Sequence, residues 1–368
     1  LSLHKIAQKH NPEICLYPHN MAAIQTHLVT GGSGFIAQHL VNELLLRGLC
    51  VHTTVRTIKN AKKVGALKAL QEQYPSGRLK LFEADLLEWG SFKEAMQGCT
   101  VVHHVASPFL MAEKIKDGQK ECVEPALKGT QNVLATVEET EAVKRVVLTS
   151  TIGAIFGDYA DVQDQMAGIM SEKYFNETST VEHNPYHYSK VLAEKEAWEI
   201  AKRQDRWDMV VICPGLVLGP PLSKGSDSGS LYLMDELLRG ELFFGVPNLS
   251  FATVDVRDVA AAHIKAAETP SAKGRYVVAS KDMTTFLDIS RLFRRLSKSA
   301  LIPNHQLPDF LVRVMGPLFG LTQKWISRNL GVRFMVDNSR SITELNIDLR
   351  PLESTLTDHY QAWKASQK

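Results

Sequence analysis

A tyrosine and a lysine four residues apart, Tyr186 and Lys190, form the pair with the clearest potential for proton chemistry. They follow Asn184 and Pro185, which are typical of a helix N-cap and of the first residue of a helix. The spacing then places both side chains on one helix face. A nearby ammonium favours the phenolate and lowers the pKa of a tyrosine, so we expect Tyr186 to donate a proton to a carbonyl that is being reduced.

The same Tyr-x-x-x-Lys pattern also occurs at Tyr360 and Lys364, so the pattern alone is weak evidence. The first copy follows an apolar run that ends in three hydroxyl residues, Thr149-Ser150-Thr151. A hydroxyl from Thr151 or Ser150 would hold the carbonyl oxygen of a substrate. No such hydroxyls precede the second copy, which we interpret as a coincidence at the surface.

A glycine-rich turn near the start of the chain indicates the cofactor. An apolar run ends in Gly31-Gly32-Ser33-Gly34, and an amphipathic run begins directly afterwards with Phe35 and Ile36. Glycines remove the Cβ atoms that would keep a pyrophosphate from the backbone N–H groups, and the small Ala37 lets the helix approach the strand. The segment predicts a dinucleotide site. At that site we expect Lys190 to bind the nicotinamide ribose as well. The alternative is an ordinary strand-to-helix turn, because the spacing is not the common G-x-G-x-x-G.

The residue at the end of the second expected strand indicates whether the cofactor is NAD or NADP. NAD enzymes place an Asp or Glu here to bind the ribose 2′-hydroxyl. This chain has Arg56 instead, followed by Lys59, Lys62 and Lys63. A guanidinium fork suits a 2′-phosphate, so we expect NADP(H). The alternative is a solvated basic loop.

Two further expected strands end in residues that suit a cofactor crevice. Asp85 could accept the amino group of adenine, or it could cap the following helix. Val105, Ala106 and Ser107 are small enough for the chain to pass close to a cofactor. His103-His104 precede them, and adjacent strand residues point to opposite faces, so we expect structural histidines and no metal site.

Apolar β-type runs alternate with helical patterns from residue 23 onward, and the pattern loosens after a Pro/Gly/Ser-rich loop near residue 220. The predicted fold class is α/β: a doubly wound parallel sheet, or Rossmann fold, with a smaller, interleaved C-terminal substrate lobe. The expected strands are 26–30, 50–55, 79–84, 100–105, 143–150, 209–213 and 274–279. The expected units are a leader or disordered extension (1–22), an NADP-binding domain (23–215, with 252–280 returning to it) and a substrate-binding lobe (216–251 and 281–368).

Composition narrows the class of protein. The chain has 368 residues, of which 44% are hydrophobic, and its net charge is +2, so we expect neither nucleic acid nor a membrane surface as a partner. Its five cysteines are scattered without a Cys-x-x-Cys pair, which favours reduced thiols in the cytoplasm and no structural metal. No apolar run is long enough for a spanning helix. A monomer or homodimer acting on a small-molecule carbonyl or alcohol is expected.

Taken together and in order, these motifs resemble the extended short-chain dehydrogenase/reductase family. More narrowly, they are similar to its dihydroflavonol 4-reductase, cinnamoyl-CoA reductase and methylglyoxal (carbonyl) reductase group. The matching pieces are Thr30–Ala37, Thr54-Val55-Arg56 with Lys63, Val105–Pro108, Gly129–Leu134, Thr149–Thr151, Pro185–Lys190, Pro214–Val217, Val254–Val259 and Asp337–Ser341.

The resemblance implies an NADPH-dependent oxidoreductase with Tyr186 as the acid, Lys190 as its partner and Thr151 as the catalytic hydroxyl. The family's usual residue at position 151 is the second serine of a Ser-Ser pair, so Ser150 is the fallback. The implied cofactor-binding residues are Gly31, Ser33, Gly34, Phe35, Ile36, Arg56, Lys63, Asp85, Leu86, Val105, Ala106, Ser107, Thr149, Ser150, Lys190, Pro214, Gly215 and Val217.

Departures from the group's motifs bear on the substrate. The chain has His183-Asn184-Pro185-Tyr186-His187-Tyr188 where cinnamoyl-CoA reductases carry Lys-Asn-Trp-Tyr-Cys-Tyr. The asparagine that dihydroflavonol reductases place after the catalytic serine is absent from Ile152–Gly157. A broader aldehyde/ketone or polyketide-like carbonyl reductase is therefore preferred. The apolar segment Pro308–Leu321 either lines a hydrophobic pocket or forms a buried core helix.

Three other functions share parts of this pattern. A sugar-nucleotide epimerase or dehydratase would keep a tightly held NAD, but it predicts an acidic residue where Arg56 stands. A hydroxysteroid dehydrogenase working in the oxidative direction has the same catalytic group. A non-catalytic dinucleotide sensor need not retain Tyr186, Lys190 and the strand hydroxyls together.

Overall fold

Seven strands form one parallel sheet in the order β11-β7-β5-β4-β1-β2-β3, as the computed structural model shows for residues 25–74, 77–108, 115–223 and 228–367. Their bounds are β1 Thr26–Val29, β2 Cys50–Val55, β3 Leu79–Glu83, β4 Val101–His104, β5 Arg145–Thr149, β7 Asp208–Pro214 and β11 Gly274–Val278. The order reverses between β1 and β4, and ligands of such sheets bind at the carboxyl ends of the strands beside this switch point. The predicted doubly wound sheet is confirmed.

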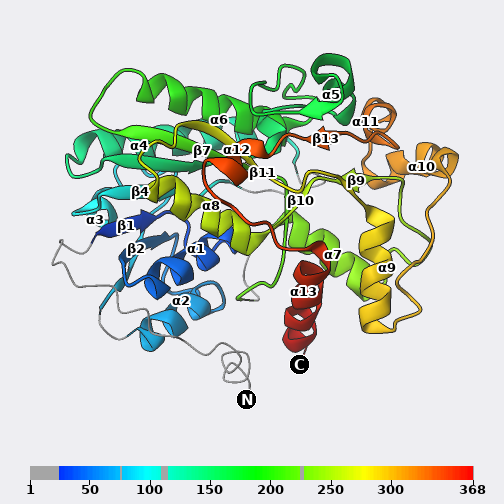
Figure 1. Ribbon diagram of the computed structural model, residues 1–368, viewed down its shortest axis with the longest axis horizontal. Helices are drawn as coiled ribbons and strands as arrows, with labels where there is room; N and C mark the ends of the chain where they lie inside the picture. The colour runs from blue at the N-terminus through cyan, green and yellow to red at the C-terminus, as the bar shows by residue number, and fades with distance from the viewer. Residues whose placement is uncertain (1–24, 75–76, 109–114, 224–227, 368) are drawn as a thin grey trace.

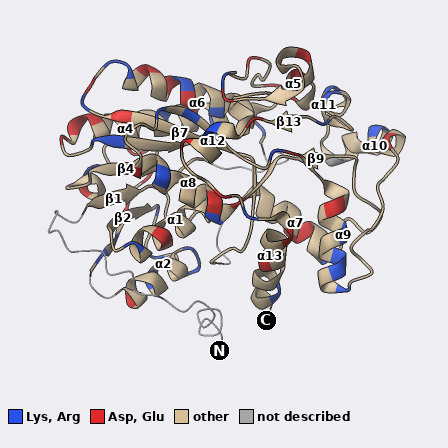
Figure 2. Cartoon of the chain, in the orientation of Figure 1, with Lys and Arg blue, Asp and Glu red and all other residues tan. Residues whose placement is uncertain are grey.

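Helices cover both faces of the sheet (Figure 1). On one face α1 (Phe35–Leu46) packs against α8 (Val256–Glu268), with α2 (Ala61–Gln73) beside α1. On the other face α4 (Glu124–Glu139) packs against α6 (Pro185–Ala201), with α3 (Lys93–Met96) beside α4. Covered on both faces, the central strand β4 is buried along its whole length. Charged side chains lie on the outer surfaces of the covering helices (Figure 2).

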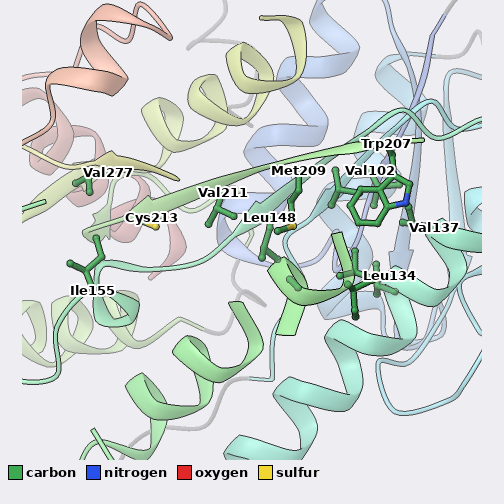
Figure 3. Packing of buried hydrophobic residues seen from close by; sticks show 14 of the residues in the cluster. Val102, Leu134, Val137, Leu148, Ile155, Trp207, Met209, Val211, Cys213 and Val277 are labelled. Carbon is green, nitrogen blue, oxygen red and sulfur yellow. The ribbon is translucent and has the colours of Figure 1, made fainter. Parts of the chain in front are cut away.

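The largest part of the core fills the space between the sheet and the pair α4 and α6. Figure 3 shows Val102 and Leu148 of the sheet facing Leu134 and Val137 of α4, with Trp207 at the start of β7. None of these residues is more than 7% exposed. Burying an aliphatic side chain of this size contributes about 1.5–3 kcal/mol. Ala197 and Ile200 of α6 belong to the same cluster, so this packing holds α6 against the sheet.

The remaining elements build a smaller unit with its own core. Helices α7 (Gly229–Arg239), α9 (Phe286–Ser297) and α13 (Leu352–Ser366) share one apolar cluster. This smaller unit is connected to the sheet by β8 (Leu216–Leu218), which directly follows β7 in the chain. β8 pairs in parallel with β10 (Thr253–Asp255). The short elements are η3 Gln119–Val123, η4 Ile152–Ala154, α5 Tyr159–Met166, β6 Ile169–Met170, β9 Ser250–Phe251, β12 Thr284–Thr285, α10 Asp309–Met315, η5 Gly316–Phe319, α11 Gln323–Asn329, β13 Met335–Val336 and α12 Ser339–Thr343.

Two expectations from the sequence are wrong. Tyr360 is not a surface residue, because α13 buries it to 6% exposure within the cluster of the smaller unit. The segment Pro308–Leu321 is not a buried core helix. Val312 is buried, but Phe310 is 65% exposed and Leu318 is 83% exposed.

The expected leader, residues 1–22, lies outside the described residues. Among the described residues, no helix is both long enough and apolar enough to cross a membrane. The cysteines of that part, Cys50, Cys99, Cys122 and Cys213, are free thiols.

Candidate active site

The turn between β1 and α1 has no room for side chains. Gly31 has a φ of 71°, a left-handed value that suits glycine. A Cβ added to Gly31 would lie 3.0 Å from the Cα and Cβ atoms of Ala106, and one added to Gly32 would lie 2.1 Å from Oγ1 of Thr53. The turn therefore lies directly against β2 and against the chain that follows β4.

Hydrogen bonds to β2 fix the shape of this turn before α1. The N–H of Gly31 donates to Oγ1 of Thr54 (3.1 Å) and that of Gly32 to its carbonyl (2.8 Å). Gly34 is the N-cap of α1, which has no acidic residue in its first turn. The first N–H groups of a helix lack carbonyl partners within it, and the helix dipole favours anions there. A pyrophosphate fits this combination of bare backbone and helix start.

Thr30 ties β1 to β4 at the switch point. Its Oγ1 accepts the N–H groups of Val105 (3.1 Å) and Ala106 (3.0 Å) and lies 3.0 Å from Nδ1 of His104. Because the hydroxyl accepts from both backbone groups, its own hydrogen goes to Nδ1 of His104. The small residues Val105 and Ala106 are thus fixed beside the glycine turn, as the sequence predicted for a crevice wall.

The basic residues expected near a 2′-phosphate lie at the far end of β2. Arg56 follows the strand directly and is exposed, and Lys63 lies in the first turn of α2, half-buried. The loop between them is held by Glu83 at the end of β3, whose Oε1 accepts the N–H of Ile58 (2.7 Å). This bond and the Thr57 hydroxyl lower the pKa of Glu83. Arg56 is therefore exposed directly after the carboxyl end of β2, beside a loop that Glu83 holds in place.

Asp85 shapes its own loop and does not cap the following helix. Its Oδ1 accepts the N–H of Leu87 (2.9 Å), whereas α3 begins after Phe92. Asn132 of α4 holds the same loop from below, because its Nδ2 donates to the carbonyl of Leu86 (3.1 Å). The capping alternative is thus wrong, and the adenine alternative stays a prediction.

Lys190 joins the ends of β4 and β5. Its Nζ donates to Oγ of Ser107 (3.2 Å) and to the carbonyl of Thr149 (3.5 Å). Oγ1 of Thr149 lies on the other face, 2.9 Å from Nε2 of His263. Burial lowers the pKa of Lys190 to about 8, and the nearby Glu194 opposes this shift. The side chain therefore stays mostly an ammonium near neutral pH.

Tyr186 lies in the first turn of the same helix and is half-buried. Burial raises the pKa of its phenol to about 12, with a smaller contribution from Cys122. The prediction that Lys190 lowers this pKa is therefore wrong: desolvation raises the pKa, and the Lys190 ammonium donates to Ser107 and Thr149 instead. The neutral phenol is the form that a proton donor requires.

Asn184 precedes α6, but its side chain does not cap the helix. The residue has a φ of 58°, a left-handed conformation that asparagine tolerates better than most residues. Its Nδ2 donates to the carbonyl of Gly157 (2.9 Å) and to Oδ1 of Asp158 (3.1 Å). Asn184 is the N-cap residue of α6 as predicted, but it makes no side-chain capping bond and instead ties the start of α6 to the loop before α5. Pro185 is the first helical residue, as predicted.

The two candidate catalytic hydroxyls have different partners. Oγ1 of Thr151 accepts the N–H of Gly153 (3.2 Å), which leaves its own hydrogen available to a substrate oxygen. Thr151 is also half-exposed. Ser150 is 5% exposed, and its hydroxyl donates to the carboxylate of Glu194. The geometry favours Thr151 over Ser150 as the catalytic hydroxyl.

The expected nicotinamide segment crosses from the large sheet to the small unit. Pro214 ends β7, and a Cβ on Gly215 would lie 2.1 Å from the carbonyl oxygen of Ala252. Val217 lies in β8 and pairs with Val254 of β10. Gly215 is thus required by the close approach of two backbones.

The adjacent histidines of β4 point to opposite faces, as predicted. His103 lies 3.0 Å from His27 (Nε2 to Nδ1) and packs against the ring of His263, whereas His104 bonds Thr30. Within the described ranges, no group of three or more His, Cys, Asp or Glu could hold a metal ion. Sequence reasoning missed Glu194 and its partner Arg275; the spacing of four residues between Lys190 and Glu194 was the one available signal.

The comparisons with known proteins agree with this geometry. A family model described as the NAD dependent epimerase/dehydratase family matches residues 27–279. The chain is 40% identical over 283 residues to cinnamoyl-CoA reductase CAD2 of Medicago truncatula, covering 76% of this chain and 83% of that protein. It is 36% identical over 271 residues to tetraketide alpha-pyrone reductase 2 of Arabidopsis thaliana, covering 73% and 81%.

Solved structures give the same result. The yeast methylglyoxal/isovaleraldehyde reductase Gre2, solved with NADPH, superposes with a TM-score of 0.72 at 25% identity, covering 93% of this chain and 99% of that one. Vestitone reductase from alfalfa, at 22% identity and a TM-score of 0.67, shares the fold. The resemblance inferred from the motifs is confirmed: the chain belongs to the NAD dependent epimerase/dehydratase family, among the extended short-chain dehydrogenases/reductases.

Proposed function

We propose that this protein is an NADPH-dependent reductase that transfers a hydride to the carbonyl of an aldehyde or ketone, and that reversibly oxidises the alcohol. One observation carries the proposal. Lys190 joins the ends of β4 and β5, one helical turn from Tyr186, and the same edge of the sheet carries the glycine turn that leads into α1, a helix start without a side-chain cap. The named activities of the relatives, all reductases of small carbonyl or thioester compounds, support it.

The side chains have separate roles in this reaction. Thr151 donates a hydrogen bond to the carbonyl oxygen, which polarises the carbonyl and fixes its orientation. Tyr186, a neutral phenol, gives its proton to that oxygen as negative charge develops there. The ammonium of Lys190 then stabilises the phenolate that remains. When bound, NADPH supplies the hydride, and the Lys190 ammonium also binds its nicotinamide ribose.

We propose a binding place for three parts of the cofactor. The turn Gly31–Gly34 and the start of α1 fit the pyrophosphate, because Cβ atoms there would collide with neighbouring strands. Arg56, exposed at the end of β2, is proposed to bind the 2′-phosphate. Leu86 and the backbone of the Asp85 loop are proposed to surround adenine. This arrangement favours NADPH over NADH.

We further propose a broad carbonyl specificity and a reducing compartment such as the cytoplasm. His183–Tyr188 departs from the cinnamoyl-CoA reductase motif even though relatives of that name are 40% identical. The buried thiols Cys99 and Cys213 are free, with pKa values raised by burial to about 12, so they are unreactive in the neutral range.

The first experiment is NADPH consumption, with NADH in parallel, across aldehydes, diketones, aromatic ketones, dihydroflavonols, hydroxycinnamoyl thioesters and steroids. Turnover that prefers NADPH is expected for at least one carbonyl class, and the rank order describes the substrate pocket. The purified protein is also assayed for retained cofactor. A tightly held NAD without net NADPH consumption would overturn the proposal in favour of an epimerase or dehydratase.

A further inference from the structure

A buried ion pair joins α6, the helix that carries Tyr186 and Lys190, to the edge strand β11. Glu194 of α6 faces Arg275 of β11, with 2.6 Å between Oε1 and Nε. Their side chains are 1% and 6% exposed. Burying two charges carries a large desolvation cost, which is offset only by close contact and additional hydrogen bonds. None of the roles described above requires this pair.

Both partners have those additional hydrogen bonds. On the carboxylate, Oε1 of Glu194 accepts from Nε1 of Trp198 (3.2 Å), and Oε2 accepts from the hydroxyl of Ser150. On the guanidinium, Arg275 donates to the carbonyls of Glu172 (3.0 Å) and Ala154 (3.2 Å). The pair is therefore fixed in one geometry between α6 and the edge strand of the sheet.

The carboxylate of Glu194 lies close to Lys190 and also contacts the strand end that carries Thr151. It stands one helical turn after Lys190, on the same side of α6, and both side chains line one cavity with Ser107 and Thr149. It also holds Ser150, which lies between the two residues that act in the site: Thr149, whose carbonyl accepts from Lys190, and Thr151.

We propose that Glu194 is a positioning residue of the active site. Through Ser150 its carboxylate fixes the strand end that presents the Thr151 hydroxyl, and through its charge it keeps the amine of Lys190 protonated. Arg275 holds the carboxylate in place through the ion pair. This inference rests on the proposed reductase function for its purpose, but its structural content concerns groups that exist without cofactor or substrate.

The electrostatic consequence has a definite sign. Burial favours the neutral amine and lowers the pKa of Lys190 to about 8, whereas the negative charge of Glu194 raises it. Removing that charge takes away the larger of the two contributions that oppose desolvation; the smaller one comes from Cys213 of β7. The pKa of Lys190 then falls further, and a larger fraction of the side chain is neutral at working pH, where it neither binds ribose hydroxyls as well nor stabilises a phenolate.

The test measures the titration of Lys190 directly. Only the neutral amine reacts with an acylating reagent, so the rate of Lys190 labelling against pH, followed by peptide mass spectrometry of the cofactor-free protein, gives its midpoint. Glu194→Gln is expected to lower this midpoint by about one pH unit or more. Glu199→Gln is the matched control, since Glu199 lies on the same helix but is exposed and pairs with Lys202. It should leave the midpoint unchanged.

Because Glu194→Gln leaves a buried guanidinium unpaired, the variant could unfold. The double variant Glu194→Gln/Arg275→Gln removes both charges and keeps two hydrogen-bonding side chains of suitable length. It is expected to fold, by circular dichroism, and to show a lowered midpoint. An unchanged midpoint in either folded variant overturns the electrostatic part of the proposal.

The positioning part is tested through Ser150. Ser150→Ala should lower kcat about tenfold and leave both KM and the Lys190 midpoint unchanged, because the alanine breaks only the link between the strand end and the carboxylate. An unchanged kcat overturns this part. If the wild-type protein reduces no carbonyl, the proposed function fails while the labelling result still decides the charge effect, so the two failures are distinguishable.

Discussion

Mild acid should strongly destabilise this fold, because it buries several histidines in their neutral form. The perturbation is a change from about pH 7.5 to about pH 5.5, which leaves most carboxylates ionised. Burial lowers the pKa of eight histidines, among them His52 and His187. The six whose pKa shifts are large are His27, His39 and His359, lowered to about 4, His104 and His263, lowered to about 3, and His103, lowered far below its usual range.

The sign follows from proton uptake on unfolding. In the unfolded chain each histidine titrates near pH 6.5, so at pH 5.5 it binds about 0.9 proton, while the native state binds almost none. The stabilisation is therefore complete above the unfolded pKa and is lost as the pH falls from about 6.5 toward the native values near 4. The loss of stabilisation at pH 5.5 is roughly 1 to 2 kcal/mol for one such histidine.

Six independent sites give an upper bound of about 8 kcal/mol at pH 5.5. His27 and His103 contact each other, so their contributions are coupled and the sum is smaller. Even half of that value is a large share of the roughly 5–15 kcal/mol that holds a typical domain folded.

Urea unfolding at a series of pH values, followed by tryptophan fluorescence, measures the effect. His39→Gln keeps a donor for the carbonyl of Pro220, which Nε2 of His39 reaches at 2.8 Å. This variant should recover roughly 1 to 2 kcal/mol at pH 5.5. The control is His305→Gln at an exposed position, which should recover nothing. A wild-type urea midpoint that is the same at pH 7.5 and pH 5.5 would refute the reasoning.

Three further predictions concern the site. Tyr186→Phe should lower kcat about 100-fold or more and leave the NADPH dissociation constant nearly unchanged; full activity would exclude the phenol as the proton donor. Arg56→Glu should weaken NADPH binding about tenfold or more and spare NADH, measured by fluorescence titration; an unchanged preference would mean that the 2′-phosphate binds elsewhere. Gly32→Ala brings a Cβ within 2.1 Å of Oγ1 of Thr53 and should cost about 1–3 kcal/mol in urea unfolding, partly restored by adding Thr53→Ala. Additive losses would contradict that steric cause.

The sheet and its cofactor turn were predictable because their signals are local. An apolar run with no alternation predicted β4, and the chain observed there is buried on both faces. The glycines at 31 and 32 stand where neighbouring strands leave no space for a Cβ. Pro185 at the first helical position followed from its fixed φ and missing N–H.

What the sequence could not indicate depends on contacts between distant residues. Arg275 is far from Glu194 in the chain, and only the pairing of β11 with β7 brings it behind α6. The pKa of Tyr186 depends on how much water the folded chain removes, which no spacing reveals. Asn184 was a reasonable capping residue by type, but its left-handed backbone turns the side chain toward Gly157.

The late position of β11 in the chain has a consequence for synthesis. β11 completes the edge of the sheet beside β7, yet residues 215–273 separate the two strands. A nascent chain that has not reached Val278 exposes the edge of β7 to other unfinished chains. It also holds the carboxylate of Glu194 without its guanidinium. Premature termination before β11 should therefore give products that aggregate or are degraded, although they contain every element from β1 to α6.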